Sequence, residues 1–463
     1  MADDSGGLAG DGRLDGDGRL DMELTGQLSA GGFNGGAGLG IPLAPFRLLQ
    51  GAMTAAPLAF MATLGVMLFR PPDLEFYHLD RVAFGALLLL VALRALALRQ
   101  PLWFVRPVTW PMFGLFVLSL MGVLAEPYVP EQWSVFAAKW VVPFALYHVA
   151  EMVFQDDASL RQFETFCLIV LGYLCVIAVA FLAGARPLIF PRYILDPSLG
   201  IHADRARGPF LQAVANGVTL IMLGLVALNA YRRGRLRGVA AVFFLIALPL
   251  AVLATKTRAV WLSFAGAVAF LFLSSGNLRV RRACLRVAAL GMVGLLGAVS
   301  FQGSREALLE RAEERSPVDF RISLYRAGWN MFLEKPFLGW GTHSMEAELA
   351  RRMDDFRQES FVFHNSYLEV VVEHGLMGLA LYMWVLFDLF RAGRVAHVGR
   401  VQALRLGFID IHFRALWPVL VAVYAVNACF VVMNYQFVNG LLFAVAGMLS
   451  AWSRMAAGER QAC

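Results

Sequence analysis

Charged residues are scarce in this 463-residue chain. They make up 16% of it, against 59% apolar residues, and the mean hydropathy is +0.62. Soluble globular proteins carry about 25% charged residues, so the composition excludes that class, together with disordered, collagen-like and disulfide-rich proteins. A polytopic membrane protein remains, and the length accommodates about a dozen spans of roughly 20 residues.

Cysteine and lysine are scarce too. The five cysteines include no pair within a predicted outer loop, so the sequence implies no disulfide framework. None of the three lysines (Lys139, Lys256 and Lys335) follows a glycine as a P-loop lysine does. The only Asp-x-Asp is Asp15-Gly16-Asp17, near the amino terminus. We therefore expect no nucleotide-dependent or metal-dependent donor site, and no cofactor.

Apolar stretches predict an all-α bundle of about twelve transmembrane helices. Residues 1–40 are rich in Gly and Asp and predict a disordered tail. Nine spans are expected within 41–301, a long outer loop at 302–363, three spans within 364–455 and a short tail at 456–463. The stretches lie near 49–69, 82–99, 107–125, 133–154, 163–183, 209–229, 237–254, 259–275, 282–301, 365–390, 415–432 and 436–452.

Arginine-rich loops predict the orientation. Loops 94–106, 230–238, 277–286 and 391–414 hold sixteen arginines and one acid, which is typical of cytoplasmic loops and places both termini in the cytoplasm. The net charge of +6 is thus spread between spans, which indicates a bilayer rather than a nucleic acid as the partner.

The long outer loop is expected to form a helical cap on the bundle. Ser316-Pro317 is a typical helix start, and Pro336 is expected to end that helix. A second helix is expected near 344–358. One apolar face is predicted for the first helix, made of Val318, Ile322, Tyr325, Trp329 and Phe332.

Two outer segments carry cations where the topology disfavours them. Segment 184–208 holds four arginines, among them Arg205 and Arg207, and the short link 255–258 holds Lys256 and Arg258. Pairing with nearby aspartates or snorkelling at helix ends would explain this pattern. We favour a cationic site for an anion on the outer face, because guanidinium groups suit phosphate. Lys139, in the fourth span, either extends this site or pairs with a neighbouring helix.

His364 and Asn365 stand where the outer loop returns to the membrane. In a continuous helix, Gly375 and Gly378 would lie within about 20° and 40° of His364, so another helix could pack closely beneath the imidazole. The helix dipole favours a neutral ring, which makes His364 a candidate general base. The alternatives are an interfacial cap with ordinary packing glycines, or a zinc site. A zinc site would draw on the four outer histidines, whose spacing fits no zinc template: His78, His202, His343 and His364.

Four segments resemble the O-antigen ligase superfamily, in the family's order. HNSYLEVVVEHGLMG (364–378) resembles its H[NSQ]x9GxxG signature, and RARGPFLQAVANG (205–217) resembles the segment that opens a span. TKTRAVWLSF (255–264) contains its Arg-x3-Leu element. FRISLYRAGWNMFLEKPFLGWG (320–341) resembles its Arg…Trp…Pro-x-x-Gly-x-Gly stretch.

The resemblance implies a glycosyltransferase that uses neither metal nor nucleotide. It would move a glycan from undecaprenyl diphosphate to an acceptor hydroxyl, such as lipid A core, at the periplasmic face of the bacterial inner membrane. His364 would activate or orient the acceptor, and Arg258 would act on the diphosphate. The other substrate contacts would come from Arg205, Arg207, Arg321, Arg326, Lys139 and Asn365, and Gly375 and Gly378 would be structural.

Two alternatives stay open from the sequence. The first is an O-antigen or exopolysaccharide polymerase that extends a lipid-linked glycan. The second is a transporter or lipid flippase with a cationic site, which would place charges near the bilayer midplane and show internal repeats. We find no repeat between the halves of the chain, and the candidate residues gather at one predicted interface. The transferase is therefore favoured.

Overall fold

The computed structural model describes residues 43–70, 78–99, 101, 104–125, 127–200, 202–300, 316–353, 363–393 and 407–458. It divides into two units, Met1–Phe46 and Arg47–Cys463. Only the first residues of one helix are described in the smaller unit. The predicted tail 1–40 lies outside the described residues, as do 302–315 and 354–362 of the outer loop and the end of the carboxy-terminal tail.

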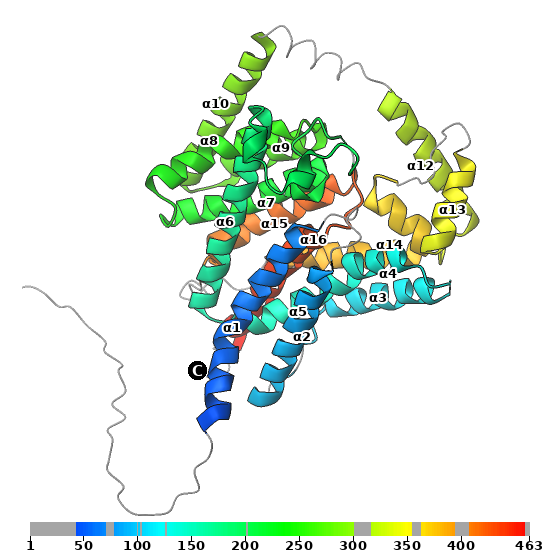
Figure 1. Ribbon diagram of the computed structural model, residues 1–463, viewed down its shortest axis with the longest axis horizontal. Helices are drawn as coiled ribbons and strands as arrows, with labels where there is room; N and C mark the ends of the chain where they lie inside the picture. Colours follow the sequence, from blue (N-terminus) through cyan, green and yellow to red (C-terminus); the bar gives the residue numbers. More distant parts are fainter. Residues whose placement is uncertain are drawn as a thin grey trace, which may run out of the picture. The chain divides into compact units, whose positions relative to one another are not determined.

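The described residues form an all-α structure without strands, and every one of the twelve predicted stretches is helical (Figure 1). A π-helical turn, Ala137–Val141, joins α4 to α5. The helices are α1 (Leu43–Leu68), α2 (Leu79–Leu98), α3 (Thr109–Leu124), α4 (Pro130–Phe136), α5 (Val142–Val153), α6 (Asp157–Leu182), α7 (Ala213–Arg232), α8 (Gly238–Ala254), α9 (Arg258–Ser274), α10 (Leu278–Ser300), α12 (Ser316–Glu334), α13 (Thr342–Arg352), α14 (Ser366–Ala392), α15 (Ile411–Asn427) and α16 (Gln436–Gly458).

Four of the described helices are long and apolar enough to cross a membrane. They are α6, α7, α14 and the Gln436–Met455 part of α16. Five apolar helices of 10 to 17 residues accompany them, within α1, α3, α8, α9 and α15. The membrane character of the chain is thus supported, while the count of twelve spans stays a prediction.

The helices of the larger unit pack around two central ones. α7 is buried on nearly every face, and α16 packs along α5. Ion pairs join helix ends that are predicted to be cytoplasmic: Arg106 Nε lies 2.9 Å from Glu151 Oε1, and Arg232 bonds to Asp410. Such pairing lets charged groups lie at the ends of an otherwise apolar bundle.

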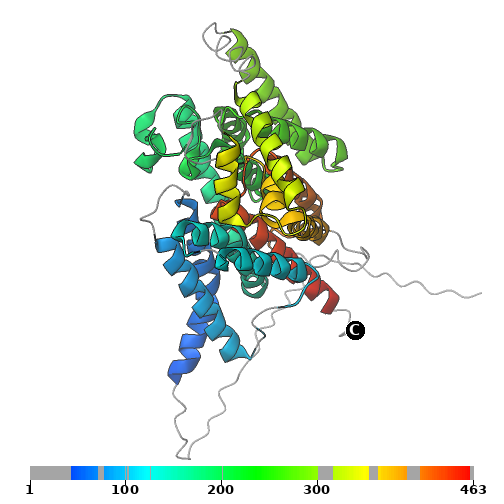
Figure 2. The same cartoon turned by 90° about the vertical axis from the view of Figure 1, so that its right-hand side faces the viewer.

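The outer loop does contain a helical cap, made of α12 and α13, which packs against α14 (Figure 2). Pro336 follows the end of α12 as predicted, and the second helix begins at Thr342. The predicted apolar face of α12 is wrong in part, because Ile322 and Trp329 are 43% and 53% exposed. The buried face carries Leu324, Ala327, Met331 and Phe332, which form a small core with α13 and α14.

Candidate active site

His364 lies directly before α14, with its side chain half-buried. Its backbone is left-handed, with φ of 50°. Burial lowers the pKa of His364 below the ordinary histidine value, and the Arg321 guanidinium and His202 lower it further. Arg321 comes from the cap and His202 from the segment between α6 and α7, so three distant parts of the chain meet here. The low pKa keeps the imidazole neutral near pH 7 and able to accept a proton.

Asn365 and Ser366 fix the position of His364. Asn365 is the N-cap of α14, since its side-chain oxygen accepts from the N–H groups of Tyr367 and Leu368 at 3.0 and 3.1 Å. Ser366 N donates to the Ala428 carbonyl at 2.8 Å, and its hydroxyl donates to the Val431 carbonyl at 3.0 Å. The Asn365 side chain is therefore committed to capping α14 and not to the expected substrate contact. Serine, which the signature also allows at this position, is an equally good N-cap residue.

α14 is not a continuous helix, which corrects the geometry expected for the two glycines. Gly375 adopts φ of 65° and ψ of −165°, and the helix is broken there. A Cβ at Gly375 would lie 2.2 Å from the carbonyl carbon and oxygen of Phe337. Gly375 thus admits the backbone of the cap turn, whereas the sequence predicted that it admits a neighbouring helix.

The break in α14 exchanges hydrogen bonds with the turn after α12. The N–H groups of Trp340 and Gly341 donate to the carbonyls of Val372 and Glu373 at 2.9 and 3.0 Å. In return, the N–H groups of Leu376 and Met377 donate to the carbonyls of Pro336 and Phe337 at 2.7 and 3.4 Å. Backbone groups freed by a break in an apolar helix are costly unless they are satisfied, and the turn satisfies these four.

Gly378 serves a different contact. A Cβ at this position would lie 2.2 Å from the His374 Cβ and 3.5 Å from Leu118 of α3. His374 is buried, and its Nε2 lies 2.8 Å from the Ser119 hydroxyl of α3. Gly378 therefore packs against α3 through the His374 side chain, as a structural residue.

Arg258 is exposed at the first position of α9. Within the described part of the chain, no acidic group pairs with it. The helix has no side-chain cap, because the Thr257 hydroxyl donates to the Thr255 carbonyl at 2.9 Å. The first N–H groups of α9 and the Arg258 guanidinium thus gather at one helix end, which is suited to an anion.

The Arg205 segment is tied to the end of α8, just before α9 begins. Ala206 N donates to the Ala254 carbonyl at 3.0 Å, which brings the residues around Arg205 beside Lys256 and Arg258. Arg205 itself is half-buried, with Nε 3.9 Å from Asp204 Oδ1. From α12, Arg321 lies close enough to lower the pKa of His364. Arg326 is exposed, and among the described residues no contact links it to this group.

Arg207 is placed differently from the expectation. It is fully buried, at 0% exposure. Its Nε donates to the Ile194 carbonyl at 3.0 Å, and its two terminal nitrogens donate to the Leu199 and Asp196 carbonyls. The guanidinium therefore holds the preceding loop together, and this burial argues against the predicted substrate contact.

Lys139 pairs with a neighbouring helix, the second of its two predicted roles. Its Nζ lies 2.9 Å from Glu369 Oε1 and 2.9 Å from Glu373 Oε2, and all three side chains are buried. The Thr342 hydroxyl of α13 donates to Glu373 Oε1 at 2.5 Å. This buried network links α14, the turn between α4 and α5, and the cap, and it commits the Lys139 ammonium to two carboxylates of α14.

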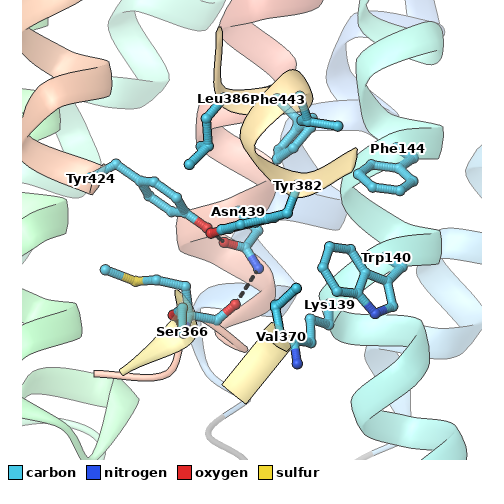
Figure 3. Close-up of a pocket in the computed structure, with 12 residues that line it drawn as sticks. Lys139, Trp140, Phe144, Ser366, Val370, Tyr382, Leu386, Tyr424, Asn439 and Phe443 are labelled. Carbon is cyan, nitrogen blue, oxygen red and sulfur yellow. Dashed lines mark hydrogen bonds between the residues drawn. The ribbon is translucent and has the colours of Figure 1, made fainter. Parts of the chain in front are cut away.

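A small cavity that Ser366 helps to line lies between α14 and α16 (Figure 3). Two of its polar side chains bond to each other, since the Tyr424 hydroxyl donates to Asn439 Oδ1 at 2.8 Å. Asn439 Nδ2 donates to the Met433 backbone carbonyl at 2.9 Å. The rest of the lining is mainly apolar. We interpret this cavity as a packing gap between helices and not as a substrate site.

Sequence reasoning missed Glu369, Glu373 and Thr342, and it considered His202 only as a possible zinc ligand. Glu369 and Glu373 gave a usable signal, since they lie four residues apart in an otherwise apolar stretch and so share a helix face with a possible cation partner. Thr342 gave none. Among the described residues, no group of three or more His, Cys, Asp or Glu side chains is arranged to hold a metal ion.

These features define a class: an all-α membrane protein with a helical cap, whose turn docks into a broken helix headed by a half-buried histidine. Residues 241–383 match the family model described as Wzy_C, O-antigen ligase. This match over about a third of the chain supports the resemblance to the O-antigen ligase superfamily that the motifs indicate. It contains Arg258, Arg321, His364 and Gly375, whereas Lys139, Arg205 and Arg207 lie outside it. No curated protein matches the chain.

Proposed function

We propose that the protein is an O-antigen ligase-type glycosyltransferase. It moves a glycan from undecaprenyl diphosphate to an acceptor hydroxyl, on lipid A core or a similar acceptor, at the outer face of the bacterial inner membrane. The observation that carries the proposal is the half-buried His364 at the start of α14, near Arg321 and within the segment that matches the O-antigen ligase family model. The arginine distribution of the loops supports cytoplasmic termini and a periplasmic site.

His364 acts as the base in the proposed reaction. The acceptor hydroxyl passes its proton to the neutral imidazole while its oxygen attacks the anomeric carbon of the donor sugar. The bond from that carbon to the diphosphate oxygen breaks, and its electron pair leaves with the diphosphate. The product is a glycoside, and the released proton resides on His364 until solvent or the diphosphate takes it.

The arginines stabilise the leaving group. Arg258 and the uncapped start of α9 face the diphosphate, with Arg205 beside them and Arg321 approaching from the cap. Guanidinium groups keep their charge and present forked donors, so they offset the negative charge that builds on the diphosphate oxygens. We leave Arg207, Lys139 and Asn365 out of the substrate contacts, since their side chains are committed to the protein. Arg326 keeps at most a peripheral contact.

Transfer by the purified protein in liposomes tests this proposal. The protein is incubated with an undecaprenyl diphosphate-linked repeat unit, with and without lipid A core, and the products are resolved by gel and mass. A His364-dependent product on lipid A core indicates a ligase, and a ladder of longer lipid-linked glycans without core indicates a polymerase. His364→Ala is expected to abolish transfer, whereas His412→Ala, at an exposed position on α15, keeps it.

A second comparison addresses the diphosphate site. Arg258→Lys is expected to fail, because a point charge does not reproduce a forked contact. Arg286→Lys, at an exposed position on α10, is the matched control and keeps activity. If no product forms and donor binding is unaffected in Arg258→Lys, the diphosphate site is wrong and the transporter interpretation returns.

A further inference from the structure

The cap turn presents two large apolar side chains outward. Phe337 and Leu338 are 73% and 63% exposed, although the backbone of the same turn is bonded to α14. The residues that flank the turn carry charge: Lys335 Nζ lies 3.9 Å from the centre of the Trp340 ring, and Glu334 pairs with Arg352. The two exposed residues at the tip of the turn are therefore apolar, while charged groups at its ends are paired within the cap.

The hydrogen bonds to α14 set the depth of this tip. They join it to residues on both sides of Gly375, sixteen residues before Arg391, which lies in the last turn of α14. Sixteen helical residues span ~24 Å, so this distance is shorter than the ~30 Å hydrocarbon core of a bilayer. With Arg391 at the cytoplasmic edge of the core, Gly375 and the docked turn lie ~6 Å inside its outer edge, and tilt of the helix places them deeper.

The exposed surface of α14 agrees with this depth. From Ser366 to Gly375, the side chains of α14 are buried or half-buried. Exposed apolar side chains begin at Leu376 and Met377, which are 46% and 47% exposed and directly adjoin the turn through its hydrogen bonds. Phe337 and Leu338 thus extend the lipid-facing surface of α14 onto the cap.

We propose that the Phe337–Leu338 tip of the cap is immersed in the hydrocarbon of the outer leaflet. Its partner is the acyl chains of the bilayer, not water and not a second protein. Unpaired backbone N–H and C=O groups would be costly in hydrocarbon, but α14 satisfies those of the turn. Only apolar side chains of the tip then face the lipid. The proposal depends on α14 crossing the membrane and not on the chemistry of transfer.

Photo-crosslinking tests the depth of the tip. Phe337 is replaced by p-benzoylphenylalanine, which is similar in shape, and the full-length protein is reconstituted in vesicles of phosphatidylethanolamine and phosphatidylglycerol. Met377 carries the same probe as the positive control. Ile322 carries the probe as the matched negative control. It is an exposed apolar residue of the cap, and its neighbour Arg321 lies near His364, at the end of α14 that we place outside the hydrocarbon.

We expect a mass increase of one phospholipid at positions 337 and 377 after illumination, and no such increase at 322. A lipid adduct at 377 without one at 337 would overturn the proposal, as would a protein adduct at 337 in native membranes. Monodispersity of each variant by size-exclusion chromatography verifies its fold. Since the assay needs neither donor nor acceptor, loss of the proposed transfer activity cannot produce either result.

Discussion

Replacing Gly375 with alanine tests the docking of the cap turn into α14. The backbone at Gly375 has φ of 65° and ψ of −165°, a region that costs a residue with a side chain ~1–3 kcal/mol. The new Cβ would also lie 2.2 Å from the Phe337 carbonyl, which must move away. The hydrogen bonds from Leu376 and Met377 are then lost, at ~0.5–1.5 kcal/mol each.

Together these costs amount to ~2–6 kcal/mol, which raises the undocked fraction of the turn at least ~30-fold. Hydrogen–deuterium exchange measures this directly, because the amides of Trp340, Gly341, Leu376 and Met377 donate across the junction. In Gly375→Ala we expect these four amides to exchange faster by at least that factor, and transfer activity to fall with them.

Gly266→Ala is the matched control. Gly266 lies within α9, and an added Cβ there meets no atom within 4 Å. In the Gly266→Ala variant, the four amides at the cap junction are expected to exchange at the same rates as in the parent protein. Parental exchange rates and activity in Gly375→Ala would refute the argument that glycine at this position holds the turn.

Three further predictions follow from the site. Asn365→Ala loses the cap of α14, at ~1 kcal/mol, whereas Asn365→Ser keeps it; equal thermal midpoints for the two variants in detergent would contradict this role. The transfer rate falls in acid as His364 becomes protonated, with a midpoint below the ordinary 6.5, because burial and Arg321 lower its pKa. Arg321→Gln removes one of these causes, so the midpoint moves to higher pH, and an unmoved midpoint argues against the contact. Lys139→Met leaves two buried carboxylates unpaired, at ~3–5 kcal/mol, which is measured as a lower unfolding midpoint; a parental midpoint would show that the carboxylates are neutral without it.

The helices and the histidine were predictable, because both depend on local sequence. Apolar runs of roughly span length indicate helices wherever they lie in the chain. His364 was found because its motif is contiguous, and the cap helix was found because Ser316-Pro317 and Pro336 mark its two ends. The buried face of α12 was not predictable, since apolar residues occupy more than one face: Leu324 and Met331 are buried while Ile322 and Trp329 are exposed.

The broken helix and the roles of individual cations depend on contacts distant in the chain. A glycine in an apolar run looks the same in a straight and in a broken helix, and the partner of Gly375 is a turn almost forty residues earlier. Lys139 was compatible with a ligand or with a carboxylate, and only the packing against α14 decides between them. The same holds for Arg207, whose burial depends on the folding of the loop before it.

The docked turn also gives the fixed spacing of the His364 signature a physical meaning. The cap is anchored at Gly375, and the histidine stands eleven residues before it, at the other end of a rigid, three-turn segment. The length of this segment fixes the position of the His364 imidazole relative to the docked cap turn. One inserted residue would raise the imidazole by ~1.5 Å and rotate it by ~100° around the helix axis, away from Arg321.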